Sequence, residues 1–137
     1  MAPHATQFVD TPWFALQSRF DTWQLGNIAQ LPCTGNPLAC NSTMWAQMQA
    51  YGPAFMAQFA PFQTPESHNG AFLDACLVHG STNGLIDGMT NYQAFQAWLS
   101  GSVNWVTQKC TGSTPSTDGS PFDGPCDRSA ACEKFPA

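Results

Sequence analysis

The sequence predicts an α/β fold of which this chain holds only a part. Two short apolar runs, over residues 12–16 and 70–79, have the length and composition of strands that are covered on both faces. Helix-forming segments follow each run. Parallel strands covered on both faces need further strands beside them, and about two strands and three helices cannot complete such a sheet. We therefore expect residues 1–137 to form a single partial domain, the C-terminal part of a larger α/β domain.

The first strand is predicted over residues 12–16, Pro-Trp-Phe-Ala-Leu, which is short, apolar and opened by a proline. A short helix over residues 21–31 follows it. Asp21 is the predicted N-cap, because its carboxylate can accept the unpaired backbone N–H groups of a first helical turn. Apolar side chains recur in this segment at a spacing compatible with a helix: Trp23, Ile28 and Leu31.

A longer helix is predicted to begin after Asn41-Ser42-Thr43 and to end at Pro61. Gly52-Pro53 lies in its middle, and we expect a kink or a split there because proline lacks the backbone N–H. An apolar stripe runs along the segment: Met44, Trp45, Met48, Tyr51, Phe55, Met56 and Phe59.

The second strand is predicted over residues 70–79 and ends at His79. Thr90 then caps a third helix, which Gly101 ends in the position of a left-handed cap. Four apolar side chains are expected on one face of that helix: Tyr92, Phe95, Trp98 and Leu99. Trp45 and Trp98 lie on predicted helix stripes and are assigned to the core, whereas Trp105 remains open between core packing and a carbohydrate platform.

Six cysteines in a short chain predict disulfides. None forms a Cys-x-x-Cys pair and no histidine lies at zinc-finger spacing from them, so a structural zinc site is disfavoured. Cys33 and Cys40 flank a turn-forming stretch and are the first expected bridge. Three pairings stay open among the other four: Cys76, Cys110, Cys126 and Cys132. Residues 111–137 are predicted to be a surface tail held at its far end by two of these cysteines.

The composition excludes several classes of partner. Charged residues make up 9% of the chain, the net charge is -5, and the four basic residues are scattered, so binding to nucleic acid or to an anionic membrane surface is disfavoured. No apolar run of about 18 residues is present to span a membrane. The sequon Asn41-Ser42-Thr43 and the cysteines favour a secreted glycoprotein. Residues 1–10 lack the pattern of a signal peptide, so we expect the natural N-terminus to lie elsewhere.

Asp21 and His79 are the candidate catalytic residues. They are associated with the ends of the two predicted strands, in the chain order in which a Ser-Asp-His hydrolase supplies its acid and its base. Each also has a structural interpretation: a helix cap for the aspartate and a half-buried histidine at a strand end. Asp74, placed within the second strand, and Asp87, in a loop, rank below Asp21 as acids. The two other histidines are expected at the surface: His4 and His68.

Residues 11–29 and 69–79 together resemble the C-terminal half of the pectin acetylesterase family, which includes the Notum carboxylesterases. The family pattern Tyr-Asp-x-Trp-Gln-x-x-Asn corresponds to residues 20–27, and a strand ending in Ser-Cys-x-x-His corresponds to residues 75–79. The closing Pro-Cys-x-x-x-Cys pattern corresponds, with extra residues, to residues 124–132. Three positions depart from the family: Phe20 replaces Tyr, Ala75 replaces Ser, and Gly80 stands where plant members often have Cys.

The resemblance implies a secreted α/β-hydrolase that acts on acyl esters, with Asp21 as triad acid and His79 as triad base. It implies that the nucleophile motif, Gly-Cys-Ser-Ala-Gly-Gly in the family, lies upstream of Met1, since no Gly-x-Ser-x-Gly turn occurs here. The expected function is therefore a serine-type carboxylic ester hydrolase that deacetylates a cell-wall pectin or polysaccharide, without metal or organic cofactor. This chain alone is expected to be inactive.

Two alternatives remain. A noncatalytic secreted module would retain the C-terminal half of the fold as a binding or structural unit, and its signal peptide would join directly to Ala2. A small disulfide-linked domain complete in itself would unfold cooperatively as 137 residues. The partial-domain interpretation instead predicts aggregation or molten behaviour of the isolated chain, because its strand edges are unpaired.

Overall fold

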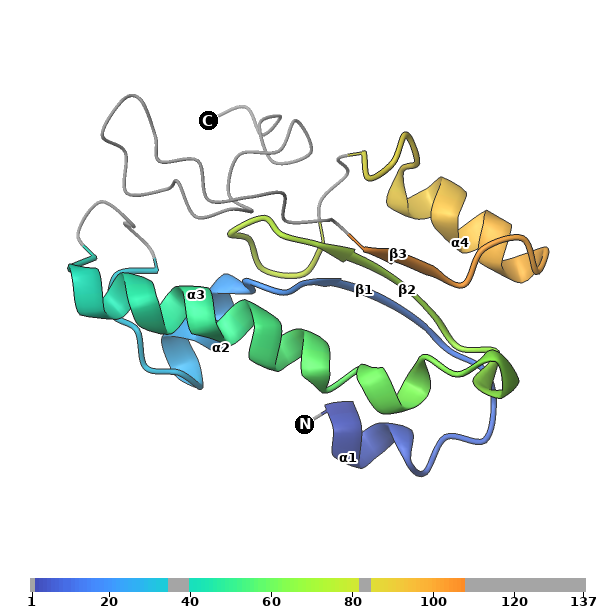
Figure 1. Cartoon of the computed structure of the whole chain (residues 1–137), viewed down its shortest axis with the longest axis horizontal. Helices are drawn as coiled ribbons and strands as arrows, with labels where there is room; N and C mark the ends of the chain where they lie inside the picture. The colour runs from blue at the N-terminus through green and yellow to red at the C-terminus, as the bar shows by residue number, and fades with distance from the viewer. Residues whose placement is uncertain (1, 35–39, 82–84, 108–137) are drawn as a thin grey trace.

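The computed structural model describes residues 2–34, 40–81 and 85–107, which form a three-stranded parallel sheet with helices on both of its faces (Figure 1). The strand order is β1-β2-β3. The elements in chain order are α1 (Ala2–Thr6), β1 (Phe14–Ser18), α2 (Thr22–Asn27), α3 (Ser42–Ala57), the 3-10 helices η2 (Ala60–Phe62) and η3 (Pro65–Ser67), β2 (Gly70–Asp74), α4 (Asn91–Leu99) and β3 (Trp105–Thr107). The expected α/β class with few parallel strands is confirmed.

The strand register brings the carboxyl ends of β1 and β2 together. Phe14 pairs with Gly70 at one end of the two strands, and Ser18 pairs with Asp74 at the other. Both strands therefore end at the same level, and the segments that follow them leave the sheet at one edge. That edge is where ligands bind in open α/β sheets.

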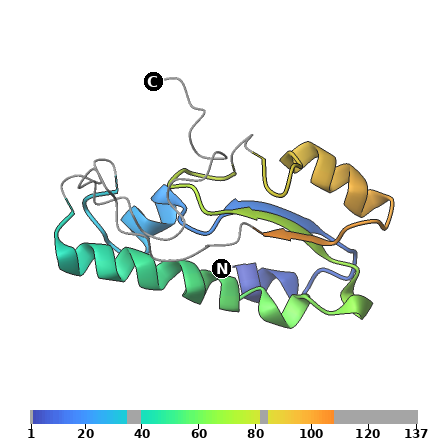
Figure 2. The ribbon, with the colours of Figure 1, turned by 45° about the horizontal axis from the view of Figure 1, so that its top comes forward.

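Three layers build the core (Figure 2). Because successive strand residues point to opposite faces, Ala71 and Leu73 of β2 face α3 and pack with Phe59, while Phe72 faces α4 and packs with Ala94. A third cluster joins α2 and its following loop to α3: Leu25, Leu31, Cys33 and Met48. The sheet and α3 together thus fix the position of α2.

The strands differ from the sequence-based prediction in their bounds. The first strand lies at 14–18 rather than 12–16, and the second ends at Asp74, five residues before His79. Asp74 is therefore the last residue of β2. The first strand is also less covered than expected, because β1 is one of the two edge strands of the described sheet and Leu16 is 45% exposed. The third strand, β3, was not predicted, since three residues carry too little periodicity to be recognised.

The helices also differ in detail. Asp21 caps α2 as predicted, but the helix ends at Asn27, and Trp23 and Ile28 are exposed while Leu25 is buried. The longer helix α3 begins with Asn41 as N-cap. It continues through Pro53 without splitting and ends at Ala57, before the expected stop at Pro61. In α4 only Ala94 is buried, so the predicted face is largely exposed: Tyr92, Phe95 and Leu99.

Gly52 of α3 accommodates the aromatic ring of Phe20. A Cβ atom at position 52 would lie 2.5 Å from Cζ of Phe20, which is too close for any side chain. Only glycine lets the helix backbone approach this ring. The contact positions the residue immediately before Asp21 against α3, so a glycine that weakens the helix has a packing role here.

The bridge between Cys33 and Cys40 is present as predicted, with a Cα–Cα distance of 5.2 Å. Cys76 is also disulfide-bonded. The other cysteines, Cys110, Cys126 and Cys132, and the predicted tail over residues 111–137 lie outside the described residues.

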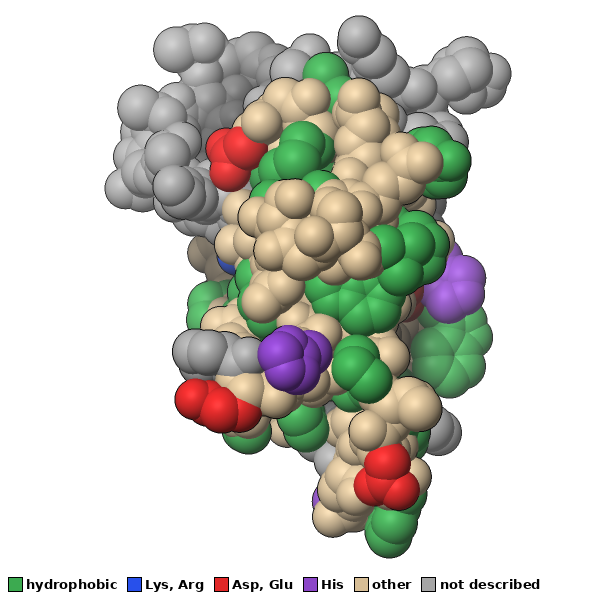
Figure 3. All heavy atoms as spheres, turned by 90° about the vertical axis from the view of Figure 1, so that its right-hand side faces the viewer, with side chains coloured by type: hydrophobic (Ala, Val, Ile, Leu, Met, Phe, Trp, Pro, Cys, Tyr) green, Lys and Arg blue, Asp and Glu red, His purple; other side chains and the backbone are tan. Residues whose placement is uncertain are grey.

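The described surface carries few charges. Figure 3 shows the face at the right-hand side of Figure 1, where polar uncharged and apolar side chains predominate and acidic ones are isolated. This matches a sequence with only 9% charged residues. Within the part of the chain that the structure describes, no helix is long and apolar enough to cross a bilayer.

Candidate active site

Asp21 is a fully buried carboxylate at the N-terminus of α2. Its Oδ1 accepts a hydrogen bond from the backbone N–H of Gln24 at 2.9 Å, which is the capping interaction expected from the sequence. This one bond uses only part of the capacity of a carboxylate, which can accept about four hydrogen bonds. The cap interpretation therefore does not exclude a second role.

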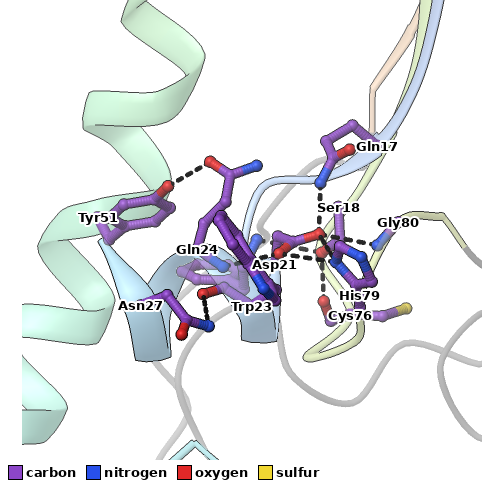
Figure 4. Close-up of polar contacts among 11 residues, drawn as sticks. Gln17, Ser18, Asp21, Trp23, Gln24, Asn27, Tyr51, Cys76, His79 and Gly80 are labelled. Atoms are coloured by element: carbon purple, nitrogen blue, oxygen red, sulfur yellow. Dashed lines mark hydrogen bonds and ion pairs between the residues drawn. The ribbon is translucent and has the colours of Figure 1, made fainter. Parts of the chain in front are cut away.

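His79 is the second partner of Asp21. Its Nδ1 lies 2.9 Å from Oδ2 and 3.2 Å from Oδ1 of Asp21, so the expected contact is present (Figure 4). Because an ionised carboxylate only accepts hydrogen bonds, Nδ1 carries the proton and Nε2 of a neutral ring is left with its lone pair. The His79 side chain is 70% exposed whereas that of Asp21 is 0% exposed. A shielded acid thus orients a histidine that solvent or a ligand can reach.

Two further donors saturate the Asp21 carboxylate. The backbone N–H of Gly80 donates to Oδ2 at 2.8 Å, and Nε2 of Gln17 donates to the same oxygen at 2.6 Å. Burial by itself would raise the pKa of Asp21, but the hydrogen bonds from Gly80, Gln24, His79 and Gln17 together bring the pKa below its ordinary value. The carboxylate is therefore ionised at neutral pH and can balance a positive charge on the imidazole.

Backbone hydrogen bonds join the loop after β2 to the end of β1. The N–H of Thr22 donates to the carbonyl of Val78 at 3.0 Å, and the N–H of Ser18 donates to the carbonyl of Gly80. The Ser18 hydroxyl donates to the carbonyl of Cys76. These contacts explain why His79 reaches Asp21 although it lies beyond the strand that was predicted to carry it.

A cavity of about 680 Å³ lies beside the two residues, between α3 and β1. Its lining includes aromatic side chains from α2, α3, η2 and the residues just before β1 and η2: Trp13, Trp23, Tyr51, Phe55, Phe59 and Phe62. The Tyr51 hydroxyl donates to Oε1 of Gln24 at 2.6 Å, and burial and then the charge of Asp21 raise the pKa of Tyr51. His4, which was expected only to be a surface residue, is exposed and also lines this cavity.

The other candidate residues are not brought to the site. Asp87 is exposed in a turn at a φ of 50°, and His68 is exposed after η3. Asp74 is buried, but its carboxylate accepts hydrogen bonds from the N–H of Cys76 and the hydroxyl of Ser81. In the described ranges no three His, Cys, Asp or Glu side chains gather as a metal site would require.

Gln17 is the site residue that sequence reasoning missed. It is the polar residue directly after the predicted first strand and is not among the candidate residues that the sequence indicates. The sequence feature that could have indicated Gln17 is its position four residues before Asp21. Because β1 extends to Ser18, the Gln17 side chain contacts the Asp21 carboxylate directly.

Comparison with known proteins identifies the family. A sequence model of the family described as "Pectinacetylesterase" matches residues 1–110. Among curated proteins, "Pectin acetylesterase 11" of Arabidopsis thaliana is 27% identical over 86 residues, which cover 56% of this chain and 22% of that protein. The match thus spans about a fifth of the relative's length. No solved structure gives a significant match.

Proposed function

This chain belongs to the pectinacetylesterase family, and on that premise we propose that it supplies the acid and the base of a serine carboxylesterase, Asp21 and His79. The substrate we propose is an acetyl ester of a cell-wall polysaccharide such as pectin. The chain's disulfides and its sequon support a secreted protein that acts outside the cell or in the cell wall. The curated relative, named as a pectin acetylesterase, supports the choice of ester.

The contact between Asp21 and Nδ1 of His79 is the observation that carries this proposal. A serine hydroxyl is a weak nucleophile until a neutral imidazole takes its proton, and the imidazole needs an acid that holds it in the right tautomer. Asp21 is buried, ionised and 2.9 Å from Nδ1, which meets this requirement. A helix cap alone would not need a histidine at the same carboxylate.

In the proposed reaction, Nε2 of His79 accepts the proton of a serine hydroxyl as its oxygen attacks the acetyl carbonyl carbon. The imidazolium formed is stabilised by the Asp21 carboxylate and then gives its proton to the departing sugar oxygen. Water repeats the sequence on the acetyl-enzyme, and His79 again takes and returns the proton. Neither a metal nor an organic cofactor enters these steps.

The serine would come from sequence outside these 137 residues. The chain has no Gly-x-Ser-x-Gly turn, and within the described residues the His79 ring is hydrogen-bonded only to Asp21. The outer edge of β1, beside the half-exposed Leu16, is where a further strand of the same fold would pair. The aromatic cavity next to His79 would then contribute to the substrate cleft.

The test is acetate release from acetylated pectin, and from p-nitrophenyl acetate, by the full-length protein and by His79→Ala. We expect the substitution to lower turnover by about four orders of magnitude or more. Stability should change little, because the His79 side chain is largely exposed. His68→Asn is the matched control, since His68 is exposed and asparagine tolerates its φ of 53°.

Turnover by His79→Ala close to that of the parent protein would exclude the triad assignment. A full-length protein that binds the polysaccharide but releases no acetate would favour the noncatalytic module instead. Activity on p-nitrophenyl acetate without activity on acetylated pectin would retain the esterase and exclude the polymer.

A further inference from the structure

Gln17 holds the Asp21 carboxylate from the side of the sheet. It is the fourth residue of β1, its side chain is half-buried, and it lines the aromatic cavity. Its amide contacts Oδ2 of Asp21 at 2.6 Å (Figure 4). Since a carboxylate oxygen cannot donate, the contacting atom is the amide nitrogen, and the bond is a hydrogen bond to a charged acceptor.

The four donors around Asp21 differ in what fixes them. The N–H groups of Gln24 and Gly80 belong to the backbone, so the helix start and the strand-end loop position them. His79 is an exposed side chain that moves its proton in the proposed reaction. Gln17 is the remaining donor, a neutral side chain on a strand whose backbone is paired with β2 along its length.

Oδ2 is the oxygen that must serve both Gln17 and His79. Its distance to the Gln17 nitrogen is 2.6 Å and its distance to Nδ1 of His79 is 2.9 Å. A donor fixed on the strand restricts rotation of the carboxylate about its terminal torsion, which is intrinsically broad for aspartate. Without the Gln17 donor, only the backbone N–H groups of Gln24 and Gly80 would hold the carboxylate plane. The side chain that lies next to Asp21 in the cavity lining would no longer bond to it.

We propose that Gln17 is a positioning residue whose amide holds the Asp21 carboxylate in the orientation that receives the Nδ1 proton of His79. This inference rests on the proposed function, because it gives Gln17 a role in the same acid and base pair. It assigns no contact between Gln17 and the substrate. A purely structural role, in which Gln17 only links β1 to the start of α2, predicts a loss of stability without any change at His79.

The experiment reads the proton on His79 directly. The full-length protein is labelled with ¹⁵N-histidine, and a two-bond ¹H–¹⁵N correlation at neutral pH shows which ring nitrogen is protonated. The His79 signals are assigned by their absence in His79→Ala. The parent protein should show the neutral ring with its proton on Nδ1.

Gln17→Leu removes the donor at similar volume. We expect the Nδ1-protonated form of His79 to lose population to the Nε2-protonated form, and kcat for p-nitrophenyl acetate to fall by about tenfold with little change in KM. Gln17→Met, of similar length but without a donor, is the second variant, for the case in which the leucine does not fold, and the same change at His79 is expected. Gln17→Glu is unsuitable, because it would share a proton with Asp21 and so retain a donor there. Gln49→Leu, at an exposed residue of α3 that does not line this cavity, should leave tautomer and kcat unchanged.

An unchanged His79 tautomer with unchanged kcat in a folded Gln17 variant would overturn the proposal, as would lower stability with an unchanged tautomer. If the parent protein itself lacks the Nδ1-protonated ring, the proposed function fails together with this inference. If the parent shows that ring and the Gln17 variants keep it, only the inference about Gln17 fails.

Discussion

Two buried aspartates at the ends of neighbouring strands have different surroundings. Asp21 follows β1 and Asp74 ends β2, and both side chains are 0% exposed. Asp21 accepts hydrogen bonds from His79 and lines the aromatic cavity. Asp74 accepts hydrogen bonds from the N–H of Cys76 and the hydroxyl of Ser81. Its charge also acts on Arg19, whose pKa is below its ordinary value because burial lowers it more than Asp74 raises it.

Burial and position at a strand end therefore do not distinguish a candidate catalytic acid from a structural one. The partners distinguish them. The hydrogen bonds of Asp74 with Cys76 and Ser81 stabilise the path of the chain after β2. Asp21 bonds to a titratable ring carried by the loop that follows β2, and that side chain is 70% exposed. This difference predicts opposite outcomes for the same substitution at the two sites.

Asp21→Asn should have the largest effect, and on turnover. An amide at position 21 can donate as well as accept, so the imidazole can be held in the wrong tautomer, which costs about 10⁴-fold in kcat in a Ser-His-Asp enzyme. Acetate release by the full-length protein measures this. The loss of a single ordinary hydrogen bond lowers kcat by about tenfold. A decrease in kcat of that size or smaller would show that Asp21 is no more a catalytic acid than Asp74.

Asp74→Asn should act mainly on stability. The substitution keeps the size of the side chain but removes the charge near the half-buried Arg19, so we expect a loss of about 1–3 kcal/mol in the free energy of unfolding. Urea denaturation monitored by tryptophan fluorescence checks this. The kcat of the folded variant should stay within about threefold of the parent, equivalent to less than 1 kcal/mol in the barrier. A collapse of kcat at full stability would make Asp74 the more important acid.

Gly52→Ala should disturb the surroundings of Asp21 and not those of Asp74, because Gly52 packs against Phe20. The new methyl group would meet the ring of Phe20, at a cost of about 1–3 kcal/mol that the better helix propensity of alanine partly offsets. Thermal unfolding should show a net loss of stability. Because Phe20 precedes Asp21, kcat should fall as well.

Phe20→Leu combined with Gly52→Ala is the matched test of that mechanism, since the smaller side chain makes room for the methyl group. The double variant should regain part of the stability that Gly52→Ala loses. If the two losses simply add, the clash with Phe20 is not the cause.

The pH dependence of stability should show the smallest effect. The native pKa of Asp21 is below its ordinary value because of its hydrogen bonds, although burial opposes them. A lowered native pKa contributes stability that is complete above the unfolded carboxyl pKa of about 3.9 and is lost as the pH falls through the native pKa. Urea midpoints measured from pH 5 downward should therefore decline more steeply in the parent than in Asp21→Asn. Equal slopes would contradict the lowered pKa.

Much of the fold could be predicted from residues that act on their immediate neighbours in the chain, such as helix caps and closely spaced cysteines. Asp21, Asn41 and Thr90 each cap the helix that the sequence predicted, because their side chains satisfy backbone N–H groups of the first turn. The Cys33 to Cys40 bridge followed from a short turn-forming loop. The meeting of Asp21 and His79 was expected from their order after two strands, although their catalytic roles stay a proposal.

The remaining features depend on contacts that periodicity does not encode. Pro53 does not split α3, because the cost of one lost backbone bond is local while packing along the helix is not. Strand β3 is too short to be recognised, and its place beside β2 arises from pairing. The contact of Gln17 with Asp21 arises because β1 extends two residues beyond its predicted end. The strand propensities of Gln17 and Ser18 do not predict this extension.

Gly80 links the candidate site to the strand pairing through its two backbone polar groups. Its N–H donates to Asp21 and its carbonyl accepts from Ser18, in a backbone conformation with a φ of 87° that glycine adopts without strain. A slip of one residue between β1 and β2 would break both bonds at once. A molecule paired in that register would consequently lack contacts that hold the Asp21 carboxylate, on which the proposed acid and base pair depends.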